Sequence, residues 1–508
     1  MSNITSQKKT KPPDNSTNQT LPQNGNQQIR KWREWHEREV PVKIIGKKTR
    51  TGIKIKITSR ELNRELALNY PNSIWTKFPN DNKQLLLDNI AYIFTAHLPF
   101  LLKGNIRLEY ATGYPHSFLW ANQAFVKHLP SYWYLYRARR GTGIMPMLKT
   151  ILNSRAIFSQ RNDIPPSFPD TIDENVIIPF TFGKDSFLTY HLAKEIGLSP
   201  LLLWFNDPVD EGYEGKHKQK LFKDFSRRIK DKCLYLDNPL GSLREKGEGW
   251  FGWELSMTSW ALLSLPFAYK YKSGYIIYSN ERSVNSFFYD DEGVRVLPDY
   301  EQTAQATEEM SLLTQALSEG EVYTTTFLQG IDEIAVLAIL KTRYPKDTFR
   351  FLMSCWSETD FGKNKRWCGH CSKCARIYVY LTAIGVNPRK EAGFEDDMFD
   401  ASKKHLFNVF GQKATGTGWD AFGLNTNEQS LAFYLSCLRG YKHGLLKEFK
   451  KSPLFLETRK KIHHLLKEYF SLHSEQVTPP QWKKKIDNII RSTLQDFRTE
   501  IFRLVDDR

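Results

Sequence analysis

The sequence lacks long hydrophobic runs. No stretch reaches the roughly 18 apolar residues of a membrane-spanning helix, and the nearest candidate, residues 91–102, is interrupted by His97 and Pro99. The first residues also lack the apolar core of a signal peptide. We therefore expect a cytoplasmic protein with no membrane partner.

Cysteine is scarce, and positive charge is never continuous. Six cysteines in 508 residues are too few for a disulfide-stabilised scaffold. Lys and Arg outnumber Asp and Glu by 72 to 56, a net charge of +16 that suggests a polyanionic partner. However, acidic residues interrupt the basic ones, including those in residues 441–508. A solvated helical surface is the simpler interpretation of this charge, and nucleic-acid binding stays open.

The length suggests two to four domains, and 40% hydrophobic residues provide ample core material. Residues 1–35 are rich in Asn, Gln, Ser, Thr and Pro, which predicts a disordered tail. In the segment TGIKIKITS at 51–59, isoleucines alternate with lysines, as in a half-buried strand. Similar segments at 40–46 and 106–110 predict a mixed α+β domain over residues 36–165.

Strand and helix patterns alternate over residues 166–392, which predicts a parallel sheet with helices on both faces. The apolar run at 176–180 predicts a buried strand, and a helix with Gly197 at its end follows. A second strand is expected at 201–205. Apolar stripes at helical spacing predict a helical C-terminal region over residues 393–508.

The loop between the first of these strands and its helix is a candidate anion site. It reads Thr181, Phe182, Gly183, Lys184, Asp185 and Ser186. Open α/β sheets bind ligands at the carboxyl ends of their strands, and the N–H groups that begin a helix attract phosphate. The loop is not a Walker A motif, because Asp185 separates Lys184 from Ser186. A helix start without any ligand is the alternative interpretation.

Polar residues also follow the next predicted strands. Asn206 ends the strand at 201–205, and Asn280, Glu281 and Arg282 follow a strand within 274–283. We expect them at the same edge of the sheet, with Asn206 near the phosphate site. A carboxylate such as Glu281 can pair with a guanine-like N–H edge, and an arginine with a carboxylate or phosphate. Loop capping is the alternative role.

Four cysteines form a candidate metal centre. They are Cys355, Cys368, Cys371 and Cys374. Three thiolates within seven residues, joined by one at the end of a predicted strand at 348–355, fit a tetrahedral zinc site. An iron–sulfur cluster is the alternative, although the x3-Cys-Pro of the bacterial ferredoxin run is absent. His370 could replace one ligand but is better explained as a spacer.

The loop and the cysteines together resemble the 7-cyano-7-deazaguanine synthase (QueC) family of PP-loop ATP pyrophosphatases. Residues 183–186 match the end of that family's Ser-Gly-Gly-x-Asp-Ser loop, and Cys368–Arg376 match its Cys-Gly-x-Cys-x-x-Cys element and nearby Arg. The resemblance covers residues 170–390 and implies a HUP-like PP-loop fold. Thr181 replaces the Ser and Phe182 the first Gly, where a side chain at positive φ costs roughly 1–2 kcal/mol.

The resemblance implies a ligase that uses ATP and Mg²⁺ to adenylate a 7-carboxy-7-deazaguanine-type carboxylate, which a nitrogen nucleophile then attacks. Lys184 and Ser186 would hold the pyrophosphate, Asp185 would orient the loop or bind Mg²⁺, and Asn280–Arg282 and Arg376 would contact the substrate. The nucleophile is either ammonia or an amine of a partner protein. Similarly extended relatives are found in bacterial antiviral defence, in Qat-type and cyclic-oligonucleotide (CBASS-type) systems. The alternatives are a tRNA-modifying PP-loop adenylating enzyme and a non-catalytic scaffold with a degenerate loop.

Overall fold

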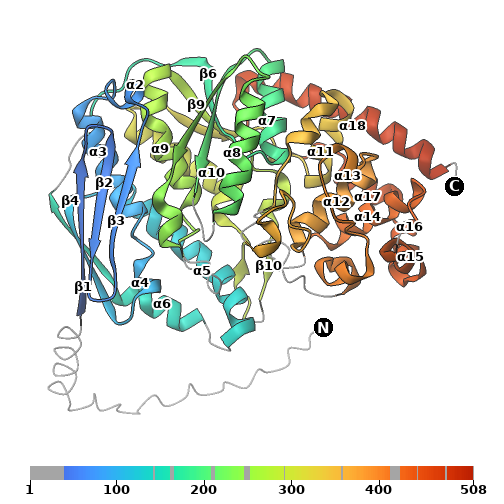
Figure 1. Cartoon of the computed structure of the whole chain (residues 1–508), viewed down its shortest axis with the longest axis horizontal. Coiled ribbons are helices and arrows are strands. Elements are labelled where there is room, and N and C mark those ends of the chain that lie inside the picture. Colours follow the sequence, from blue (N-terminus) through green and yellow to red (C-terminus); the bar gives the residue numbers. More distant parts are fainter. Residues whose placement is uncertain are drawn as a thin grey trace, which may run out of the picture.

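Figure 1 shows the computed structural model of the chain, with the N-terminal sheet at one end and the C-terminal helices at the other. The residues that the structure describes are 39–140, 144–160, 165–207, 212–244, 252–290, 292–355, 359–411, 424–442, 444–474 and 477–506. The tail predicted over residues 1–35 lies outside these ranges.

The N-terminal sheet is mixed and has the strand order β3-β2-β1-β4-β5. Its strands are β1 (Glu39–Lys48), β2 (Gly52–Thr58), β3 (Asn63–Asn69), β4 (Asn105–Gly113) and β5 (Arg155–Gln160). β1 pairs antiparallel with β2 and parallel with β4. The predicted alternation holds in β2, where Ile53, Ile55 and Ile57 are buried while Lys54 and Lys56 are exposed.

The central sheet is entirely parallel, with the order β12-β9-β6-β7-β8. Its strands are β6 (Ile172–Pro179), β7 (Ser199–Asn206), β8 (Lys232–Asp237), β9 (Ser273–Tyr278) and β12 (Tyr323–Thr326). The chain moves outward from β6 through β7 to β8, and then returns to the other side of β6 with β9 and β12. The direction of winding therefore reverses between β6 and β9, where sheets of this type open a crevice for ligands.

Helices cover both faces of the central sheet, which confirms the predicted α/β class. Ile177 and Leu203 face a cluster with α9 and α10, and Val176 and Leu202 face a cluster with α7, α8 and α11. Successive strand residues point to opposite faces, so a strand buried on both sides reads as a continuous apolar run. These helices are α7 (Lys184–Glu195), α8 (Tyr213–Ser226), α9 (Ser256–Tyr271), α10 (Ala304–Leu317) and α11 (Glu333–Arg343).

The remaining helices flank this layer on its two sides (Figure 1). α3 lies between the N-terminal sheet and α9, whereas α12, α14 and α18 pack beyond α11. They are α2 (Asn72–Trp75), α3 (Asn80–Ile93), α4 (Leu98–Leu101), α5 (Phe118–Arg140), α6 (Ile144–Asn153), α12 (Ser372–Ile384), α13 (Pro388–Glu391), α14 (Thr426–Leu438), α15 (Gly444–Lys451), α16 (Pro453–Lys460), α17 (Ile462–Tyr469) and α18 (Pro480–Asp506). Within the described ranges, no helix is long and apolar enough to cross a membrane.

The hydrophobic cores extend across the predicted domain boundaries. One cluster contains Val176 of β6 together with Phe433 of α14, and another contains Ile44 of β1 together with Leu262 of α9. The two flanking regions are therefore packed onto the central sheet through shared apolar contacts. The boundaries near residues 165 and 392 stay a prediction about the chain's organisation.

The strand predicted at 348–355 is wrong. Residues Lys346–Phe351 form a 3-10 helix, and residues 352–355 continue without a strand ladder. The large residues Phe349, Phe351 and Leu352 of this segment are all buried. This extended segment contacts the loop after β6 instead, through a hydrogen bond from the Met353 amide to the Phe182 carbonyl (2.8 Å).

Candidate functional site

The loop 181–186 joins β6 to α7 at the point where the winding of the sheet reverses. Gly183 is the residue before the helix, and no side chain of the described residues caps it. The Ser186 hydroxyl donates to the Gly183 carbonyl (2.9 Å), and the Gly183 amide donates to the Thr181 hydroxyl (3.4 Å). These two bonds fix the turn that brings the start of α7 to the edge of the sheet, where a helix attracts anions.

Phe182 has the left-handed backbone that the resemblance requires at its position. Its φ is +63°, and its ring is completely buried. The ring centroid lies 5.0 Å from that of Phe180 and 6.3 Å from those of Phe187 and Phe225. The side chain therefore points into the core and does not fill the space above the loop. Burial of a phenylalanine contributes about 1.5–3 kcal/mol, which offsets a backbone strain of roughly 1–2 kcal/mol.

Lys184 is held in a buried network of charges. Its ammonium lies 2.6 Å from Asp185 Oδ1 and 3.1 Å from Glu333 Oε1. The second Glu333 oxygen lies 2.8 Å from Nε of Arg376, so this carboxylate bridges the two cations. The side chains of Lys184, Glu333 and Arg376 are all less than a tenth exposed, with values of 4%, 6% and 7%. The network brings together the start of α7, the start of α11 and α12.

The charges in this network change one another's pKa. Burial lowers the pKa of Lys184, but the carboxylates of Asp185, Glu333 and Glu281 outweigh it and raise that pKa above its usual value. Burial raises the pKa of Glu281 well above its usual range; Lys184 acts against this shift, and the carboxylates of Glu333 and Asp185 add to it. Burial also acts to raise the pKa of Glu333, yet Arg376 and Lys184 bring it below its usual value. Glu333 is therefore a firmly ionised anchor, whereas Glu281 readily keeps a proton.

The residues after β9 separate into two groups. Glu281 lies toward Lys184, and its carboxylate also accepts the Ser283 amide (2.7 Å) as a local cap. Arg282 instead pairs with Asp332 (2.9 Å) and with Glu468 (2.8 Å) of α17. The structure thus brings Glu281 to the loop and directs Arg282 toward the C-terminal helices.

Two predicted site residues make structural contacts. The Asn280 amide donates to the Thr307 hydroxyl (3.3 Å). The Asn206 amide donates to Asp237 Oδ1 at the end of β8 (2.7 Å). In the described part of the chain, no hydrogen bond joins Asn206 to the loop after β6, although both lie at the carboxyl edge of the sheet. Their roles in binding ligands stay predictions.

Sequence reasoning missed three carboxylates at this edge. Asp332 and Glu333 follow β12, and Glu428 reaches the same place from α14. Glu428 accepts the Ile334 amide (2.8 Å) and the Tyr380 hydroxyl (3.0 Å). If the segment YTTT at 323–326 had been recognised as a strand, the first two would have been found by the rule that located Glu281. No local signal points to Glu428, because 94 residues separate it from its partner on α11.

A pocket of about 330 Å³ opens beside these residues. Arg282, Ser283, Asp332, Glu428 and Glu468 are among the residues that line it. Hydrogen-bond donors and carboxylates therefore face one space. Such a pocket suits a ligand that carries both N–H groups and an anionic group.

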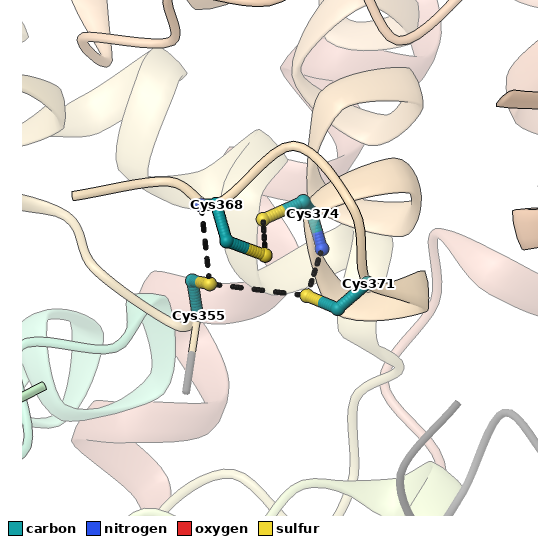
Figure 2. A group of neighbouring side chains, drawn as sticks. All are labelled: Cys355, Cys368, Cys371 and Cys374. Carbon is teal, nitrogen blue, oxygen red and sulfur yellow. Dashed lines mark hydrogen bonds between the residues drawn. The ribbon is translucent and has the colours of Figure 1, made fainter. Parts of the chain in front are cut away.

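The four predicted cysteines converge (Figure 2). All four sulfurs lie within 4.8 Å of one another, and the Cys355–Cys371 and Cys368–Cys374 separations are both 3.8 Å. A tetrahedral ion with Zn–S bonds of about 2.3 Å separates its sulfurs by about 3.8 Å. The group could therefore hold a metal ion such as zinc. An iron–sulfur cluster would insert its irons and sulfides between the thiolates and would need wider spacing.

The residues around the sulfurs support this geometry. The Cys368 amide donates to the Cys355 sulfur and the Cys374 amide to the Cys371 sulfur, both at 3.4 Å, which stabilises thiolates. Gly369 has φ +69°, and a Cβ there would lie 2.1 Å from an Asp396 oxygen. Only glycine fits this turn. His370 is exposed and stacks on Phe361 (centroids 3.6 Å apart), outside the group of ligands.

The cysteine centre and the loop after β6 are neighbours. Ser354 precedes Cys355, and its hydroxyl lies 3.6 Å from the point where a Cβ on Gly183 would stand. The Met353 amide binds the Phe182 carbonyl. Three consecutive residues therefore connect the loop to a candidate metal ligand.

No protein-family model, curated protein or solved structure matches the chain. The fold and the site define a class: an α/β protein with a parallel central sheet, a buried charge network at the reversal point of its strands, and an adjacent centre of four cysteines.

Proposed function

We propose that this protein is an ATP-dependent, AMP-forming enzyme of the QueC-like PP-loop type. It would adenylate the carboxylate of a 7-carboxy-7-deazaguanine-type compound and transfer the acyl group to a nitrogen nucleophile. The observation that carries the proposal is the arrangement around Lys184, which lies at a helix start at the reversal point of the sheet, next to Arg376 and the cysteine centre. This is where doubly wound sheets bind nucleotides.

In the first step, a substrate carboxylate oxygen attacks the α-phosphorus of ATP, and the bond from that phosphorus to pyrophosphate breaks. The amides that begin α7, together with Lys184 and Ser186, would bind the departing pyrophosphate. Mg²⁺, with Asp185 as a ligand, would neutralise charge on the phosphates. Phosphate oxygens would compete with Asp185 and Glu333 for the Lys184 ammonium.

In the second step, an amine attacks the acyl carbon, the carbon–oxygen bond to AMP breaks, and the nitrogen loses a proton. The ionised form of Glu281 is the candidate acceptor of that proton, because burial and its acidic neighbours raise its pKa to about 8 and so make its carboxylate a stronger base than an ordinary glutamate. The nucleophile would be ammonia or an amine of a partner protein. Arg282, Glu428 and Glu468 are among the residues that line the pocket that this amine would enter. The resemblance to extended relatives supports a role in antiviral defence.

Pyrophosphate release tests the proposal. Pure protein with ATP, Mg²⁺ and 7-carboxy-7-deazaguanine should release pyrophosphate, and Lys184→Gln should reduce the rate by at least about 100-fold, as expected when a group binding the leaving phosphate is lost. Lys194→Gln is the matched control, because this exposed lysine lies on the same helix and pairs only with Asp231 in the described contacts. Wild-type protein that neither turns over nor binds ATP would favour the non-catalytic scaffold.

The net charge of +16 favours a second candidate, a tRNA-modifying adenylating enzyme. Binding of bulk tRNA at physiological salt distinguishes the two. Tight, saturable binding with tRNA-dependent pyrophosphate release would support this second function.

A further inference from the structure

A groove of about 670 Å³ lies between α17 and α18, and its described lining does not include the loop after β6. Its lining is strongly basic. The cationic or protonatable side chains are His464, Lys467, His473, Arg491 and Arg498, and Glu468 is the one carboxylate among the described lining residues.

The positive charge of the groove is only partly neutralised. Among its basic residues, His473 has its Nε2 3.7 Å from Asp332 Oδ2. Glu468 is already paired with Arg282 outside the groove (2.8 Å). Arg498 donates to the neutral Ser471 hydroxyl (3.3 Å). Among the described residues, no carboxylate lies within ion-pair distance of Lys467, Arg491 or Arg498. An anionic ligand would therefore complement the groove.

The groove leads toward the candidate active site. Glu468 lines both the groove and the 330 Å³ pocket that contains Arg282 and Asp332. The Arg282–Glu468 ion pair thus stands between the two spaces. A chain lying in the groove and extending past this pair would reach the pocket.

We propose that the groove binds an acidic segment of an acceptor protein and directs an amine of that protein into the pocket. This inference rests on the proposed function, in its version with a protein amine as nucleophile. Three apolar residues are among those that line the groove, and of these Phe470 and Leu494 are buried whereas Leu472 is half-buried. Phe470 therefore offers no face on which a nucleic-acid base could stack. A basic groove with little accessible apolar surface fits an acidic peptide.

Fluorescence anisotropy of a labelled deca-glutamate peptide with the full-length protein tests the groove directly. Lys467→Glu/Arg491→Glu should weaken binding about tenfold or more at low salt, and binding to the wild type should weaken as salt rises. The matched control is Lys484→Glu/Lys485→Glu, which makes the same change of charge at exposed positions of α18 outside the groove. The control should change affinity less than about twofold.

Three results would overturn the inference. One is the absence of peptide binding, and another is an equal loss of affinity in both double variants. The third is tighter binding of a labelled oligouridylate that only the groove variant abolishes, which would assign the groove to nucleic acid.

Pyrophosphate release from the small carboxylate substrate separates this inference from the proposed function. The groove variant should retain that activity at the wild-type level, because Lys467 and Arg491 lie outside the charge network. Groove-dependent peptide binding without any pyrophosphate release would refute the enzymatic proposal and leave the docking site standing.

Discussion

Replacing Phe182 by Gly should destabilise the protein less than replacing it by Ala. Phe182 is fully buried at φ +63°. Truncation of a buried Phe to Ala costs about 3–5 kcal/mol, and Ala keeps the left-handed strain. Gly loses the same packing but relieves roughly 1–2 kcal/mol of backbone strain. The greater entropy of its unfolded chain takes back about 0.5–1 kcal/mol of this gain. We therefore expect Gly to be the more stable variant by about 0.5–1 kcal/mol.

Phe187 supplies the matched control. It belongs to the same aromatic cluster and is also fully buried, but it lies inside helix α7. There Gly should be less stable than Ala by about 1 kcal/mol, because glycine is the poorer helix former. Urea denaturation midpoints of the four variants, followed by circular dichroism, give the two rankings. If the Gly variant is less stable than the Ala variant at both positions, Phe182 carries no such strain, and the left-handed backbone assigned to it is refuted.

Three further predictions concern the metal centre, the charge network and a buried carboxyl. Cys371→Ser should lose the bound metal and lower the melting temperature, because metal binding stabilises the folded state; elemental analysis of wild type should give zinc, and iron with sulfide would refute it. Glu333→Gln leaves Lys184 and Arg376 without their shared carboxylate and should lower stability by about 3–5 kcal/mol in urea denaturation. Burial raises the pKa of Glu254 to about 7, so the unfolded chain loses this proton at lower pH than the folded protein does. The free energy of unfolding of the wild type should therefore fall by up to about 3 kcal/mol relative to that of Glu254→Gln as the pH rises from about 4.5 to 7, and should not fall further above pH 7. A constant difference between their urea midpoints over that range would contradict the raised pKa.

The fold class could be predicted because its signals are local. The alternation in β2 and the apolar run in β6 each determine which faces are buried, and the loop after β6 follows directly from them. The strand β12 was not predicted, because its short, threonine-rich sequence has no apolar periodicity, although Thr324–Thr326 are buried. Glu333, which follows this strand, was therefore not predicted as a site residue either. Residues at the edge of a sheet are predictable only where their strand is.

Long-range contacts set the rest of the site. The sequence alone does not decide whether Phe182 adopts positive φ at a position where the resemblance has Gly. The aromatic contacts that its ring makes with Phe180 and Phe225 decide this. Likewise, Glu428 reaches α11 only because α14 packs beside α12. The segment 348–355 reads as a strand, yet its large residues are buried on every side. Local periodicity cannot report such neighbours.

The cysteine centre and the loop after β6 form one mechanical unit. Cys355 is a predicted metal ligand, Ser354 lies against Gly183, and the Met353 amide holds the Phe182 carbonyl. The Phe182 carbonyl thus accepts a hydrogen bond from Met353, which is only two residues before Cys355. On the other side of the centre, Cys374 lies in the first turn of α12, the helix that carries Arg376 to Glu333. A metal ion that fixes the four sulfurs would therefore position both the loop and the arginine without touching a ligand bound there, which explains why a structural ion would stand beside the proposed phosphate site.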